Sequence, residues 1–103
     1  MDTMMGYEVR NVRERAGMNV EPFASLLGVS TSTAYHWEEL GSKETHMDKG
    51  ARRLIEALDG VCRKMTRAEA RGFGEQLATL VRTRGALHAL HALLRRHFER
   101  VSA

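Results

Sequence analysis

Apolar residues recur every three or four positions along most of the chain, the spacing that places them on one face of an α-helix. The first run is Met5, Val9, Val12 and Ala16, and Gly17 follows it at a position that suits a helix stop. We therefore expect a first helix that ends at Gly17.

Two short helices are predicted next. Asn19 is a good N-cap for one of them, and Gly28 ends it after about two turns. Ser30 caps the following helix, with Ala34 and Trp37 on its inner side. A polar connection from Leu40 to His46 then leads out of this pair.

Three longer helices complete the pattern. A fourth helix begins near Thr45 or Asp48 and ends at Gly60, and a capping box at Thr66 and Glu69 begins the fifth. Gly85 marks the turn into the last helix, whose apolar stripe is Leu87, Leu90, Leu94, Phe98 and Val101. No useful run alternates between apolar and polar residues as a strand does, so we predict an all-α fold.

Charge divides the chain into two regions. The 103 residues carry a net charge of +3, but ten acids oppose seven Lys and Arg up to Gly60, and three oppose nine after it. A chain of this length holds one small domain with an appended element. We place the boundary near Gly60, which gives a first domain at 1–60 and a C-terminal two-helix region at 61–103.

The cellular location is expected to be cytoplasmic. Cys62 is the single cysteine, so no internal disulfide can form, and no basic start precedes an apolar run as in a signal peptide. No stretch approaches the ~20 apolar residues of a membrane span. Arg63 and Lys64 follow Cys62 and could lower its pKa, although packing is the simpler role for this thiol.

The segment from Val20 to Glu39 has the layout of two short helices that cross closely around a tight turn. A small residue is needed where the helices touch, and Ala24 fits that place. Gly28 can adopt the left-handed backbone that a sharp turn requires. Such a helix-turn-helix unit can insert its second helix into the major groove of DNA.

The chain resembles the Cro/repressor-type (XRE-like) helix-turn-helix family over a longer stretch, from Val9 to Leu58. The residues that carry the resemblance are Arg13, Gly17-Met18-Asn19, Phe23-Ala24, Leu26-Leu27-Gly28-Val29-Ser30, Trp37-Glu38, Leu54-Ile55 and Leu58. The resemblance implies a lambda-repressor-like bundle that binds duplex DNA, usually as a dimer, and commonly represses transcription. The chain departs from the family at Val20, where a polar Gln is frequent, and at Gly41, which comes later than usual after the Trp-Glu pair.

The predicted base readers are Thr31, Ser32, Tyr35 and His36, at the start and on the outward face of the third helix. They are hydroxyl groups and one imidazole rather than the Arg, Lys, Asn or Gln of bidentate readout. Lys43, Lys49 and Arg10 are the predicted phosphate contacts. Glu38 would oppose DNA unless it turns inward, and either Arg13 or Arg52 could hold it.

The two C-terminal helices have three possible uses. They can pair with a second copy through Leu87, Leu90, Leu94, Phe98 and Val101, pack back on the first domain, or bind another protein such as a toxin. Dimerisation fits DNA binding, because two recognition helices one helical turn apart match a palindromic site.

Enzymatic and metal chemistry are not expected. His88 and His91 lie one turn apart without a further ligand at metal-binding spacing, and no serine lies in a nucleophile motif. We predict a dimeric, DNA-binding repressor composed of a helix-turn-helix bundle and a C-terminal helical hairpin. The alternative is a protein-interaction module or antitoxin that binds its partner through the C-terminal helices.

Overall fold

Six α-helices make up most of the described chain in the computed structural model. The model describes the backbone of residues 4–102 and the side chains of residues 4–99. The helices are α1 (Gly6–Arg15), α2 (Val20–Leu27), α3 (Thr31–Glu39), α4 (Lys49–Arg63), α5 (Arg67–Arg84) and α6 (Ala86–Ser102). No β-strand forms within these residues, where one isolated bridge pairs Met5 with Glu44. The predicted all-α class is confirmed.

Local capping signals set the starts of two helices as predicted, whereas Asn19 occupies the N-cap position of α2 without a capping hydrogen bond from its side chain. The Ser30 Oγ accepts the Thr33 N–H at 3.1 Å and begins α3. The Thr66 Oγ1 accepts the Glu69 N–H at 3.1 Å, and the Glu69 carboxylate accepts the Thr66 N–H at 2.8 Å, which completes the capping box of α5.

The start of α4 lies at Asp48 rather than at Thr45. The Asp48 carboxylate accepts the Ala51 N–H at 2.7 Å, as an N-cap does. Thr45 is buried instead, and its hydroxyl donates to the Met4 carbonyl at 2.9 Å. Thr45 therefore ties the polar connection to the N-terminal end of the described chain.

The predicted stop at Gly60 is wrong, because α4 continues to Arg63. The added turn buries Val61 and Cys62, which are 4% and 1% exposed. Burying side chains of this size is worth about 1.5 kcal/mol or more, whereas an interior glycine costs about 1 kcal/mol. Packing therefore outweighs the local preference of glycine to end the helix.

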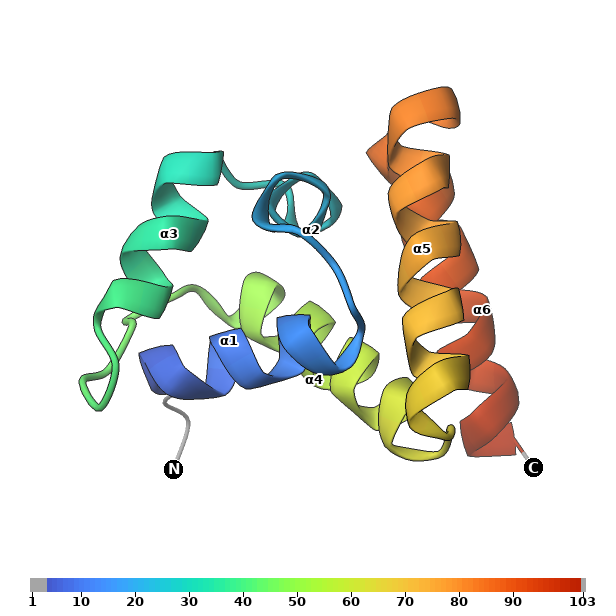
Figure 1. The fold of residues 1–103 in the computed structure, drawn as a ribbon, viewed down its shortest axis with the longest axis horizontal. Coiled ribbons are helices and arrows are strands. Elements are labelled where there is room, and N and C mark those ends of the chain that lie inside the picture. The colour runs from blue at the N-terminus through green and yellow to red at the C-terminus, as the bar shows by residue number, and fades with distance from the viewer. Residues whose placement is uncertain (1–3, 103) are drawn as a thin grey trace.

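The C-terminal hairpin packs back on the rest of the molecule. Figure 1 shows α5 and α6 side by side, and both contact α2 and α4. The radius of gyration is 12.7 Å, close to the ~13 Å typical of a single domain of this length. Of the three uses considered for the hairpin, packing on the first domain is the one that occurs within the single chain.

One apolar core joins the two predicted regions, 1–60 and 61–103. Its fully buried large side chains come from α1, α2, α4, α5 and α6: Val9, Phe23, Ile55, Leu58, Cys62, Leu77 and Leu93. The hairpin therefore supplies part of the core that the first four helices surround.

A close backbone contact explains how α5 reaches this core. A side-chain carbon on Gly74 would overlap the carbonyl oxygen of Ala16, just after α1. The neighbouring Gly17 has a φ of +65°, and the side chain of Arg71 lies against it. Gly74 is thus required by packing, because any larger residue would push α5 away from the end of α1.

Candidate nucleic-acid interface

The turn between α2 and α3 is held by its backbone. Gly28 adopts a φ of +75°, and the Val29 N–H donates to the Ala24 carbonyl at 3.0 Å. This hydrogen bond closes the end of α2 in the way of a Schellman motif. Because Ser30 caps α3 directly afterwards, the two helices are joined by three residues.

Small side chains fill the space between these two helices. Val20, Ala24 and Ala34 form a buried cluster, with Val29 packed against it. Ala24 is 1% exposed and Ala34 is 0% exposed, as expected for a close helix crossing. Since Ala34 and Trp37 point inward, the opposite face of α3 is left to solvent.

That outer face carries most of the predicted base readers. Ser32, Tyr35 and His36 are exposed and lie at positions i, i+3 and i+4, so they share one side of α3. Thr31 is half-buried at the first position of the helix. Glu39 is also exposed, one turn beyond Tyr35, and adds a carboxylate near the C-terminal end of this face.

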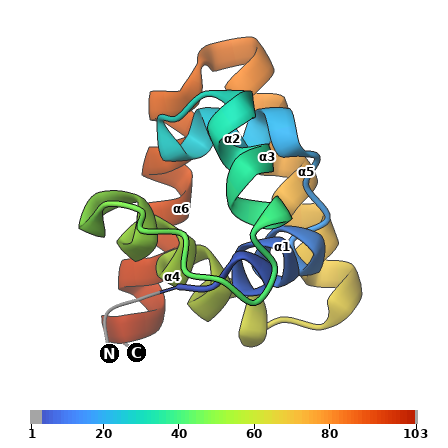
Figure 2. The same cartoon turned by 90° about the vertical axis from the view of Figure 1, so that its left-hand side faces the viewer.

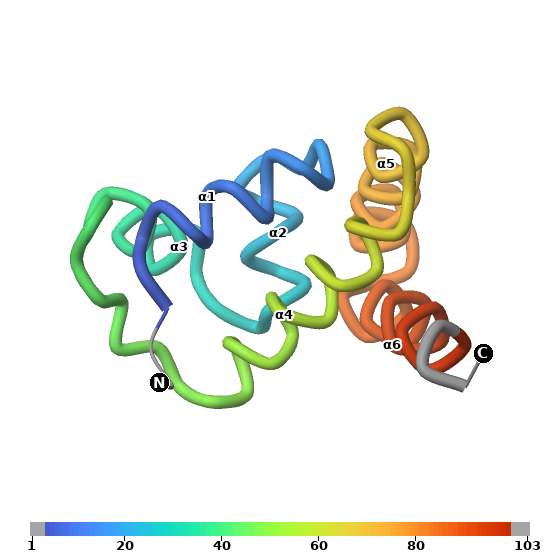
Figure 3. The backbone as a smooth tube through the Cα atoms, turned by 90° about the horizontal axis from the view of Figure 1, so that it is seen from below, coloured from blue at the N-terminus to red at the C-terminus, as the bar shows by residue number. Residues whose placement is uncertain are grey.

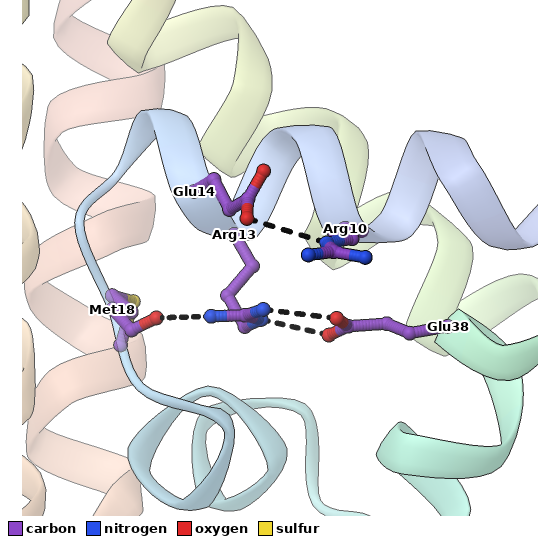
Figure 4. A network of polar contacts seen from close by, with 5 residues as sticks. All are labelled: Arg10, Arg13, Glu14, Met18 and Glu38. Carbon is purple, nitrogen blue, oxygen red and sulfur yellow. Dashed lines mark hydrogen bonds and ion pairs between the residues drawn. The ribbon is translucent and has the colours of Figure 1, made fainter.

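Glu38 is turned away from that face by Arg13. The guanidinium of Arg13 donates to both carboxylate oxygens of Glu38, at 2.7 and 2.9 Å (Figure 4). A third bond, at 2.8 Å, goes to the Met18 carbonyl in the loop before α2. Of the two partners considered for Glu38, the structure identifies Arg13.

This pair is largely removed from water, with side-chain exposures of 16% for Arg13 and 10% for Glu38. The hydrogen bond to Glu38 raises the pKa of Arg13 above its ordinary value, so the guanidinium stays charged. Two parallel hydrogen bonds fix direction as well as distance. The pair therefore links α1, α3 and the loop before α2, and sets the orientation of α3.

The predicted phosphate contacts lie on different elements. Lys43 is exposed in the connection after α3, and Lys49 is exposed at the first position of α4. Figure 2 shows this connection and α3 on the same side of the molecule. Arg10 is exposed on α1, where its guanidinium donates to Glu14 at 3.3 Å, so part of its charge is already compensated.

Arg82 of α5 belongs to the basic surplus of the C-terminal region, and its place near α2 and α3 is not predicted from the sequence. It lines a hollow beside the start of α2 together with Asn19, Tyr35 and Glu75. An arginine from the C-terminal region is thereby brought to the edge of the α2–α3 surface. No sequence signal links positions this far apart, so only the docking of α5 reveals it.

The predicted dimerisation stripe is divided between core and solvent. Leu87 and Phe98 are 62% and 61% exposed, while Leu90 and Leu94 are half-buried within the chain. Val101 lies outside the described side chains. The residues of α6 that face the core are Ala89 and Leu93, both fully buried, because the small Ala89 permits close packing.

The remaining candidate groups show no reactive arrangement. Burial, followed by the charge of Asp59, raises the pKa of Cys62 to about 11, which corrects the expectation that Arg63 and Lys64 lower it. His88 and His91 are exposed, and no group of three possible metal-binding side chains comes together among the described residues.

Comparison of the chain with protein-family models, curated proteins and solved structures finds no match. Within the described residues, no helix combines the length and the apolar character needed to cross a membrane.

Proposed function

We propose that the protein is a sequence-specific DNA-binding transcriptional regulator that inserts α3 into the major groove. The observation that carries the proposal is the α2–α3 unit, in which a three-residue turn leaves one polar face of α3 open. The α2 and α3 arrangement then acts as a helix-turn-helix. The inward-facing Glu38 supports this, because one acid is removed from a surface that must approach phosphates.

Base reading is assigned to Ser32 and His36, with Thr31 and Tyr35 at the edges of the contact. Hydroxyl groups can donate to or accept from several bases, and imidazole can donate to a guanine acceptor. Tyr35 lies beside Arg82 and the start of α2, where it suits a contact with the DNA backbone. Lys43, Lys49 and Arg10 are assigned to phosphate.

The active form is a homodimer that represses transcription from a palindromic operator. The exposed Leu87 and Phe98 of α6 supply the apolar contact between two copies, with the half-buried Leu90 and Leu94 at its edge. Burying large apolar side chains between protomers stabilises the pair. Two copies then present two α3 helices to successive turns of the duplex.

A protein-interaction module is the second candidate. The same exposed Leu87 and Phe98 favour it, since an open apolar face on α6 can take a helix of a different protein. An antitoxin would combine this contact with DNA binding through α3.

Selection of binding sites from random duplex DNA, at two salt concentrations, tests the proposal. We expect a palindrome whose half-sites are centred about 10 bp apart. The His36→Ala variant should lose about 1–3 kcal/mol of discrimination at one base, and Lys49→Ala should weaken binding to all sequences and reduce the salt slope by about one. Absence of enrichment at both salt concentrations, with the protein folded, would favour the protein-interaction module instead.

A further inference from the structure

A polar cleft on another side of the molecule runs along α1 and is bounded by the C-terminal half of α4 and the start of α5. It encloses about 810 Å³, within the range of small-molecule sites. Figure 3 views the molecule from the side where these three helix segments come together. No residue of α2 or α3 lines the cleft, so an occupant would leave the face of α3 free.

Four arginines line this cleft: Arg15 of α1, Arg63 of α4, and Arg67 and Arg71 of α5. On the α4 side, Arg63 donates to Asp59 at 2.7 Å, and Arg15 lies 3.9 Å from the other oxygen of the same carboxylate. One carboxylate therefore serves two guanidinium groups.

The α5 side is different. Arg67 and Arg71 are exposed, lie one helical turn apart, and make no ion pair within the described part of the chain. The stem of Arg71 packs on Gly17, which restricts where its guanidinium can go. Two arginines one helical turn apart thus line the cleft without an ion pair among the described residues.

The acidic residues that line the cleft do not form ion pairs with Arg67 or Arg71 among the described side chains. Glu8 accepts the Met5 N–H at 3.0 Å, and Glu14 pairs with Arg10. Glu56 is exposed on α4 and makes no ion pair or hydrogen bond with either α5 arginine among the described side chains. Four carboxylates thus line the cleft beside its four arginines, and the arginines that make no ion pair among the described side chains are the two on α5.

We propose that this cleft binds a small ligand that carries adjacent phosphate groups. Guanidinium groups form paired hydrogen bonds with phosphate oxygens, and two arginines at i and i+4 can hold two phosphates. The half-exposed ring of Tyr7, at the α1 edge of the cleft, offers a flat surface for an organic group attached to the phosphates. The site is independent of DNA binding by α3.

Titration of the ¹⁵N-labelled protein with inorganic pyrophosphate, and separately with ADP, tests the site by amide chemical shifts. We expect saturable shifts in α1, the end of α4 and the start of α5, with a Kd of about 1 mM or below. Tighter binding of ADP identifies a nucleotide-type ligand, and equal binding identifies the inorganic phosphates as the recognised group.

The matched variants are Arg67→Gln with Arg71→Gln, and Arg95→Gln as a control at an exposed position of α6. Glutamine keeps the Cγ of Arg71 that packs on Gly17. We expect the double variant to bind pyrophosphate at least tenfold more weakly, and the control to bind it unchanged. If the double variant does not fold, Arg67→Gln alone provides the comparison.

Three outcomes would overturn the site. The first is the absence of a saturable chemical-shift change up to about 10 mM pyrophosphate, far above the expected Kd. The second is pyrophosphate binding that is weakened equally in the double variant and the control. The third is a set of chemical-shift changes confined to α2 and α3. The last outcome would mean that pyrophosphate binds as a mimic of the DNA backbone.

Discussion

The helices α3 and α6 each bury one side and expose the other, but α6 adds two large apolar side chains to exposed polar residues such as His91 and Arg95. The open side of α3 carries Ser32, Tyr35 and His36, whereas that of α6 carries Leu87 and Phe98. A polar face suits a hydrated partner such as a nucleic acid, and an apolar face suits a protein. The two partners proposed for the molecule, DNA and a second protein chain, are therefore assigned to different helices.

The two helices are also held in different ways. Polar bonds from Arg13 orient α3, while apolar packing of Ala89 and Leu93 orients α6. Directional hydrogen bonds restrict the rotation of a helix about its axis to a narrow range, and apolar packing restricts it through the fit of the side chains. Separate substitutions can thus disturb one surface and leave the other intact.

The largest effect is expected where the hairpin meets α1. Gly74→Val should lower stability by about 3 kcal/mol or more, because the added side chain overlaps the Ala16 carbonyl and α5 must move. Thermal unfolding followed by circular dichroism should show a Tm drop of more than about 10 °C.

Gly72→Ala is the matched control, since a methyl group there meets nothing within 4 Å. It should raise stability by up to about 1 kcal/mol, because alanine is the better helix former. Equal stability of the Gly74→Val protein and the wild type would show that α5 does not need this contact, and that the surface of α6 is not set by it.

A smaller loss is expected at the bond that orients α3. Glu38→Ala leaves the Arg13 guanidinium largely buried without its carboxylate and should cost about 2–3 kcal/mol in urea unfolding. Glu14→Ala removes the exposed partner of Arg10 and should change stability by less than about 0.5 kcal/mol. Similar losses in the two variants would contradict the structural role of the Arg13–Glu38 pair.

The smallest effect on the single chain is expected at the open side of α6. Replacing Leu87 and Phe98 together by serine should change the stability of the monomer by less than about 0.5 kcal/mol, since both are mainly in water. The same variant should shift a dimer to a monomer in light scattering after gel filtration. A dimer that persists in this variant would place the contact between copies elsewhere.

Helix ends were largely predictable because their signals are local. Ser30, Thr66 and Gly28 act on groups within a few residues, and the structure confirms each as a cap or turn. The predicted helix end at Gly60 is wrong because α4 is extended by the burial of Val61 and Cys62 in a core that involves distant helices. Gly74 carries no local signal of its role, because the contact that requires it is with the Ala16 carbonyl, far away in the sequence.

The candidate interface was predictable to a similar extent. The exposure of Ser32, Tyr35 and His36 follows from the helical period of α3. The ion pair of Glu38 with Arg13 is one of the two pairings that the sequence predicts for this acid. The rotation of α6 could not be foreseen, because leucines occupy both of its sides and only tertiary contacts select Leu93 for the core. The positions of Arg82 beside Tyr35 and of Arg67 and Arg71 in the cleft likewise depend on how α5 docks.

The contact between Gly74 and Ala16 also bears on the order in which the protein is assembled. Synthesis proceeds from the N-terminus, so α1 and α2 leave the ribosome well before α5. Their shared core remains open until the last two helices arrive, because Leu77 and Leu93 belong to it. Closure of the fold is thereby postponed until α6 has been synthesised, and a chain that ends before α6 would present its unfinished core to chaperones and proteases.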